Sequence, residues 1–203
     1  RDCAVVLALM ADVERYAESH HGKLQALAQV LEPLHVTITL KGVLRAIEGA
    51  IQSDGSMKDT ATPELRRLTH QAQGLKQEMR QQLEQLLHSK RYEDVLQESY
   101  FAQREGRYVV PVKADMRGRI PGIVHDVSSS GATVFLEPRE LVELNNSIKV
   151  ADLEIEREVQ RILRELTTVV ASKAAEIEQG IEVLAECDVI RAKAEMSRRL
   201  KCH

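Results

Sequence analysis

The sequence is poor in aromatic residues: among its 203 residues it has no Trp, 2 Phe and 4 Tyr. The composition therefore does not favour an aromatic-rich β-sandwich or a surface that stacks nucleic-acid bases. Proline and glycine are also few, at 5 and 10 residues, so helices can run for long stretches without interruption. We expect a fold built mainly from long aliphatic helices.

The sequence also lacks an unbroken apolar run long enough to span a bilayer, so we expect no membrane insertion. Hydrophobic residues make up 43% and charged residues 29%, a balance typical of a globular domain. The 28 Lys and Arg are outnumbered by 31 Asp and Glu, which leaves a net charge of -3. No overall field attracts nucleic acid, so any contact with a polyanion must be local.

Cysteine is scarce as well. Cys3, Cys187 and Cys202 are odd in number, lie far apart and have no neighbours at metal-ligand spacing, which favours reduced thiols in the cytoplasm. The chain opens on Arg1 rather than Met, and no charged-then-apolar leader with a cleavage site follows. We therefore expect a cytoplasmic protein, present here as a segment of a longer chain.

Apolar residues recur at helical spacing through residues 1–88, in three stretches. The first stripe is Val6, Leu9, Val13, Tyr16 and His20, continued by Leu24, Leu27 and Leu31 up to Pro33. The second runs from Val43 to Ile51 and stops in a turn at 53–56. The third begins with Thr62 as N-cap and Pro63 in the first helical position. Its stripe is Leu65, Leu68, Ala72, Leu75, Met79, Leu83 and Leu86.

The pattern changes to β-type between residues 89 and 137. Arg107 to Val112 alternate, and Ile123 to Val127 and Thr133 to Leu136 are β-prone runs bounded by Gly and Ser, which predicts a small antiparallel sheet. Helical spacing resumes near Pro138. A heptad stripe then follows at Leu141, Ile148, Ile155, Ile162 and Val169, and a last helix carries Ile177, Ile181, Leu184, Val189, Ala192 and Met196.

One long helix cannot bury its apolar stripe alone, so we predict that 65–87 packs antiparallel against 141–170 as a coiled-coil-like stalk. The predicted fold is mainly α with a small antiparallel β insertion. Its parts are a helical core and lever over 1–88, a β tip over 89–137, and returning long helices of the lever and core over 138–203.

The best basic cluster is Arg107, Lys113, Arg117 and Arg119, with Asp115 as its only acid and a local charge of +3. Such a cluster could hold a phosphate backbone without reading bases, with an affinity that falls steeply with salt. A solvated hairpin edge, charged so that it resists aggregation, explains the same residues equally well.

The turn Ser128, Ser129 and Ser130 before Gly131 could offer hydroxyls and backbone N–H groups to phosphate oxygens, as an anion nest. A plain hairpin turn is an equally good interpretation. The turn lacks the paired glycines and the Lys of a nucleotide-binding loop, so we expect no ATP hydrolysis by this segment.

Catalytic and metal sites are not expected. His125 and Asp126 precede the serines, but neighbours in a strand point to opposite faces and cannot act as a base with its orienting group. Asp115 and Glu137 are interpreted as isolated acids, outside any carboxylate or His cluster, so we assign no cofactor and no metal.

Several stretches resemble the central region of bacterial MutS-like proteins of the second type, relatives of the mismatch-repair ATPase MutS. They are Arg104 to Lys113 (REGRYVVPVK), Ile120 to Pro138 (IPGIVHDVSSSGATVFLEP), Glu143 to Asn146 (ELNN), Ala50 and Ile51, Asp59 to Leu65 (DTATPEL), and Asp188 to Ala194 (DVIRAKA). The resemblance spans nearly the whole chain, and the stretch around His125 to Pro138 is long enough to be specific.

The resemblance implies a core or lever region of packed helices that ends in a clamp. Full-length members also carry an ABC-type ATPase domain and usually a C-terminal Smr nuclease-like domain, and ATP and Mg²⁺ are expected only in that absent ATPase domain. Such proteins are associated with branched or recombination-intermediate DNA and with rescue of collided ribosomes, and they form homodimers through the ATPase end.

We therefore predict a non-catalytic lever and clamp segment that binds nucleic-acid backbone without sequence specificity. The predicted contacts are Arg107, Lys113, Arg117, Arg119, Ser128, Ser129 and Ser130. The alternative is a module for protein interaction or dimerisation without nucleic-acid contact, in which binding depends on Val134 or Phe135.

Overall fold

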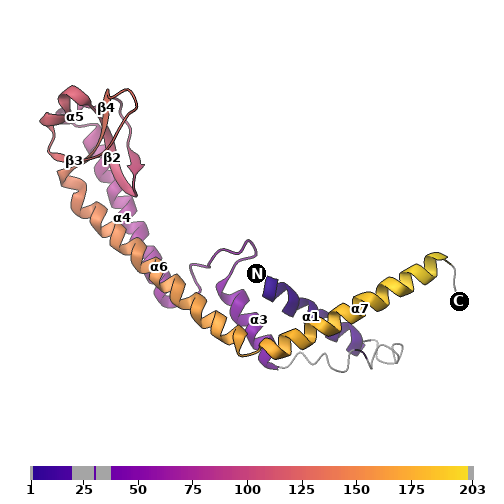
Figure 1. The fold of residues 1–203 in the computed structure, drawn as a ribbon. Coiled ribbons are helices and arrows are strands. Elements are labelled where there is room, and N and C mark those ends of the chain that lie inside the picture. Colours follow the sequence, from indigo (N-terminus) through magenta and orange to yellow (C-terminus); the bar gives the residue numbers. More distant parts are fainter. Residues whose placement is uncertain (1, 20–29, 31–37, 201–203) are drawn as a thin grey trace. The chain divides into compact units, whose positions relative to one another are not determined.

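A computed structural model of the chain describes residues 2–19, 30 and 38–200. The fold is mainly helical with one small antiparallel sheet of four strands, which confirms the predicted fold class at this level (Figure 1). The chain forms two compact units, residues 1–61 with 160–203 and residues 62–159. In the described part, no helix is both long and apolar enough to cross a membrane. The division into 1–88, 89–137 and 138–203 by role stays a prediction.

The first unit is helical. It contains α1 (Asp2–Ser19), α3 (Ile38–Ala50), the end of α6 (Val142–Ala171) and α7 (Ala174–Leu200). Its core is Leu7, Met10, Leu40, Val43, Ile47, Ile177 and Val183. The turn predicted at 53–56 is present, closed by a bridge between Ile51 and Met57.

The predicted stripe of α1 was partly wrong. Leu9 and Tyr16 are 50% and 57% exposed, whereas Leu7 and Met10 are buried against α3 and α7. Apolar residues lie on more than one side of this helix, so its packing partners rather than its periodicity select the buried face. The predicted continuation from His20 to Pro33 lies outside the described residues, apart from residue 30.

The second unit contains α4 (Pro63–Leu87), whose start and buried face are confirmed. Thr62 Oγ1 accepts a hydrogen bond from the Leu65 amide, and Pro63 takes the first helical turn. The predicted stripe is buried from Leu65 to Leu86, with Leu75 only partly covered. The amphipathic pattern and the N-cap therefore predicted this helix and its buried face correctly.

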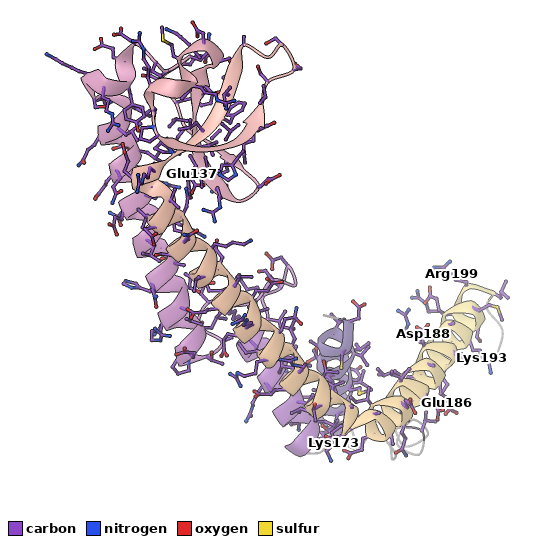
Figure 2. The ribbon with its side chains drawn as sticks, turned by 60° about the vertical axis from the view of Figure 1, so that its left-hand side comes forward. Glu137, Lys173, Glu186, Asp188, Lys193 and Arg199 are labelled. Atoms are coloured by element: carbon purple, nitrogen blue, oxygen red, sulfur yellow. The ribbon has the colours of Figure 1, made fainter. Side chains whose placement is uncertain are left out.

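The first half of α6 lies antiparallel beside α4. Lys76 Nζ is 2.7 Å from Asp152 Oδ1, and Thr62 Oγ1 donates to Glu158 Oε1 at 2.8 Å. Figures 1 and 2 both show the two helices side by side, with the sheet at their end. The heptad stripe of α6 was predicted too long, because Val169 is 42% exposed although Leu141 and Ile148 are buried.

The sheet consists of β1 (Ala102–Arg104), β2 (Arg107–Lys113), β3 (Gly122–Val127) and β4 (Thr133–Pro138). Their order is β1-β2-β4-β3, and neighbouring strands are antiparallel. The 3₁₀ segment η1 (Ala114–Arg119) connects β2 to β3. Four short elements escaped prediction: β1, η1, α5 (Lys90–Glu93) and η2 (Arg139–Leu141). Segments of three to six residues carry too little periodicity to indicate an element.

Strand β2 is buried on both faces from Tyr108 to Val112. Tyr108, Val110 and Val112 join the core with α4. On the opposite face Pro111 pairs with Phe135, and the Arg104 guanidinium lies 4.1 Å from the centre of the Phe135 ring. The predicted strand is therefore present, and both of its faces are covered.

Candidate nucleic-acid interface

Two exposed arginines are carried by η1, which leaves the end of β2. Met116 packs against the core and Ile120 is buried, so the segment is anchored on both sides of Arg117 and Arg119. The two arginine side chains are exposed. A short segment held by apolar anchors presents charge at a fixed place, which suits contact with a phosphate backbone.

The serine turn lies beside the start of η1. Ala114 donates its amide to the carbonyl of Ala132 at 3.0 Å, and Lys113 pairs with Thr133 in the sheet. The serines follow β3 directly in the sequence. The Ser128 amide donates to the carbonyl of Thr133 at 2.9 Å, which holds the turn against the start of β4. The structure therefore brings Lys113 and the start of η1 beside the 128–130 turn at one end of the sheet. The rest of η1 leads to Gly122, which pairs with Pro138 at the other end.

The turn uses several of its own donors, so the predicted anion nest is only partly available. The amide of Thr133 donates to Ser128 Oγ at 3.1 Å, and the amide of Gly131 donates to the carbonyl of Ser128 at 2.8 Å. The hydroxyls of Ser128 and Ser130 lie 3.3 Å apart. Ser129 is exposed, so its hydroxyl lies open to a ligand.

Lys113 makes one hydrogen bond within the protein and is also partly exposed to solvent. Its ammonium group donates to the carbonyl of Asp94 at 3.0 Å, and the residue is partly exposed. An ammonium has three donors, so this contact orients the side chain while leaving donors for a phosphate.

Arg107 lies apart from Lys113 and the serine turn. It opens β2 whereas Lys113 closes it, and six residue steps of about 3.3 Å place them roughly 20 Å apart along the strand. Arg107 Nη1 is 2.8 Å from Glu137 Oε1, and Nη2 donates to Asn146 Oδ1 at 2.7 Å. The predicted basic run is therefore divided, and Arg107 is committed to an internal ion pair.

The interpretation of Glu137 as an isolated acid was wrong. Its side chain is fully buried, with Oε1 accepting from Arg107 and from Asn145 Nδ2 at 2.8 Å, and Oε2 lying 2.6 Å from His125 Nε2. Sequence reasoning missed this network. The signal was an acid within the apolar run 134–138, because a buried carboxylate needs partners.

His125 and Asp126 have different partners, but the expectation that they point to opposite faces was wrong, because both reach the face of β4 that carries Phe135 and Glu137. His125 bonds to Glu137, whereas Asp126 Oδ2 is 2.9 Å from Arg104 Nε. A register shift between Val124 and Asp126 places His125 at a β-bulge. Within residues 2–19, 30 and 38–200, no three His, Cys, Asp or Glu side chains gather as a metal site.

Comparison with known proteins places the chain in a family. No family model matches it. It is similar to Endonuclease MutS2 of Geobacillus sp. (strain WCH70), with 35% identity over 200 residues, 98% of this chain and 26% of that protein. Endonuclease MutS2 of Pelotomaculum thermopropionicum is 42% identical over 163 residues, 80% of this chain and 21% of that protein.

Endonuclease MutS2 of Thermotoga petrophila is 37% identical over 160 residues, 79% of this chain and 21% of that protein. The resemblance predicted from the sequence stretches is thus confirmed over most of the chain. Over its own length the chain belongs to the MutS2 family, and it spans about a quarter of the length of the relatives it matches.

Proposed function

We propose that this chain is the lever and clamp segment of a MutS2-type ATPase and that it binds nucleic-acid backbone at the end of its sheet. The observation that carries the proposal is that Lys113 lies beside the 128–130 turn and continues into η1, which exposes Arg117 and Arg119. We name these six residues the cationic end. Its charges favour phosphates, and its lack of aromatic residues favours binding without base readout.

The proposed mechanism is mechanical. The paired α4 and α6 would carry motion from an ATPase domain outside this chain to the cationic end, as a rigid body. ATP and Mg²⁺ would act only in that domain. Homodimers in the cytoplasm, formed through the ATPase end, complete the proposal. Its ligands would be branched DNA, recombination intermediates or ribosomal RNA.

The relatives are named endonucleases. We propose that this segment supplies no catalytic residue to such an activity. The support is that His125 is engaged by Glu137 and that the Ser128 and Ser130 hydroxyls bond within their own turn. Loss of cleavage by a complete protein on His125→Ala, with binding unchanged, would contradict this part of the proposal.

The test is a salt titration of binding to a branched DNA, a plain duplex and a ribosomal RNA fragment, followed by fluorescence anisotropy. Replacing Lys113, Arg117 and Arg119 by Gln should weaken binding. For duplex DNA the slope of log affinity against log salt should flatten by up to about 0.9 per lost phosphate contact, or about 2.7 for three.

The matched control removes three other exposed cations of the same unit, Arg66 and Arg80 of α4 and Lys149 of α6. This control lowers net charge equally, so it separates a local surface from a general charge effect. Equal loss of affinity in both triple variants, or no loss in the first, would reject the cationic end. Arg107→Gln should leave the salt slope unchanged.

A protein-binding module remains the second candidate, supported by a different surface. Val134 and Phe135 are 4% and 7% exposed, so they offer little surface to a partner. The exposed apolar residues belong to the edge strand β3, where Ile123 and Val127 are 50% and 52% exposed. Salt-insensitive binding that is lost on Ile123→Thr with Val127→Thr would favour this candidate.

A further inference from the structure

The network around Glu137 connects the sheet to the start of α6. Arg107 comes from β2, His125 from β3, Glu137 from β4 and Asn145 from α6. Figure 2 shows Glu137 where the sheet meets this helix. The stretches that carry the family resemblance, 104–113, 120–138 and 143–146, therefore meet at one buried carboxylate.

Asn145 continues the β ladder beyond Val110 and Leu136, the last pair between β2 and β4. The register that pairs Val110 with Leu136 would place Tyr108 opposite Pro138, and proline has no N–H to offer. Instead Asn145 Oδ1 accepts from the Tyr108 amide at 2.9 Å, and Asn145 Nδ2 donates to the Tyr108 carbonyl at 3.1 Å. A side chain of α6 thus replaces a strand residue in the sheet.

A second link runs through the next residue of α6. Asn146 Oδ1 accepts from Arg107 Nη2, while Arg107 Nη1 holds Glu137. The helix is therefore tied to β2 and β4 by directional bonds, in addition to the apolar packing of Leu141 and Ile148 on the core. Apolar packing tolerates sliding and rotation, whereas buried hydrogen bonds with fixed partners do not.

Stability alone is a poor reason for this arrangement. Desolvating a buried ion pair opposes its attraction, and apolar residues of similar volume often serve stability equally well. What such residues do not supply is directional bonding between two elements. We propose that Glu137, Arg107, His125 and Asn145 form a joint that fixes the orientation of the sheet on α6, so that both move as one body.

The joint deepens the proposed transmission of motion and rests on it for its role. Its test uses no nucleic acid, so its failure is distinguishable from failure of the cationic end. Spin labels are placed at Val127→Cys of β3 and Val150→Cys of α6, which are 52% and 54% exposed. The native cysteines Cys3, Cys187 and Cys202 are replaced by Ala.

Pulsed electron paramagnetic resonance then measures the distribution of distances between the two spin labels. The parent should give a single narrow distribution. The apolar variant Glu137→Met with Arg107→Met should keep cooperative thermal unfolding but give a broadened distribution. A narrow distribution in this folded variant would overturn the joint, because apolar packing alone would then set the angle. A broad distribution in the parent would also overturn it, because the angle would then not be fixed.

A gentler variant decides the matter if the apolar pair does not fold. Glu137→Gln keeps the shape of the side chain and one acceptor oxygen but removes the charge that Arg107 and His125 share. A distance distribution broader than that of the parent supports the joint, and an unchanged narrow distribution refutes it. The matched control is Glu156→Gln, the same chemical change at an exposed position of α6, which should leave the distribution narrow.

Discussion

Removal of the Asn145 side chain should destabilise the second unit far more than its size suggests. Asn145→Ala deletes two hydrogen bonds to the Tyr108 backbone and one to Glu137. Asn145 is 1% exposed, so water cannot readily replace these partners. Each buried group left unsatisfied costs about 1–3 kcal/mol. Because neighbours relax, we expect a total loss of roughly 3 kcal/mol of unfolding free energy rather than the full sum.

Tyrosine fluorescence isolates this unit during urea unfolding. The chain has no Trp and 4 Tyr, and Tyr16 is the one tyrosine of the first unit, so Tyr16→Phe leaves only reporters in residues 62–159. Asn146→Ala is the matched control. Its partner Arg107 is 27% exposed, so water can take over the bond, and we expect a loss of under about 1 kcal/mol.

Asn145→Asp sharpens the result. It keeps an acceptor for the Tyr108 amide but loses the donor to the Tyr108 carbonyl and to Glu137, and it places a second carboxylate beside a buried one. We expect it to be at least as damaging as Asn145→Ala. A loss for Asn145→Ala no larger than that for Asn146→Ala would refute the reasoning that a side chain completes the ladder.

Two further substitutions test the same unit. Gly122→Ala would drive a methyl group against the backbone carbonyl of Glu137, so we expect about 1–3 kcal/mol of destabilisation by thermal unfolding, whereas Gly118→Ala, which meets open space, should be near neutral. Burial, followed by the hydrogen bond to Glu140, raises the pKa of Tyr92, so the folded state keeps a proton that the unfolded state loses. The free energy of unfolding should therefore fall as pH rises above about 10, the ordinary tyrosine pKa. In urea titrations at several pH values, Tyr92→Phe should make this fall less steep. An equally steep fall in the parent and in Tyr92→Phe would contradict the prediction.

Local signals were enough to predict the regular elements. Thr62 and Pro63 indicated the start of α4, and the spacing from Leu65 to Leu86 indicated its buried face. The β-prone runs predicted β2, β3 and β4 within a residue or two. Capping, helical periodicity and turn residues act between near neighbours in the chain, so the sequence contains them in readable form.

The candidate site was only partly readable. The closeness of Lys113 to the serine turn followed from a small antiparallel sheet that the sequence did predict. The removal of Arg107 from this set did not, because its partner Glu137 is 30 residues away. Only the sheet register brings the two together.

What the sequence alone determined is thus the type of each long element and the family resemblance. Tertiary structure decided which face of α1 is buried, that β2 is covered on both sides, and that Glu137 is the centre of a network. The physical reason is that burial and ion pairing depend on partners supplied by distant segments. Periodicity identifies the apolar and charged groups of one element, but packing chooses which of them meet.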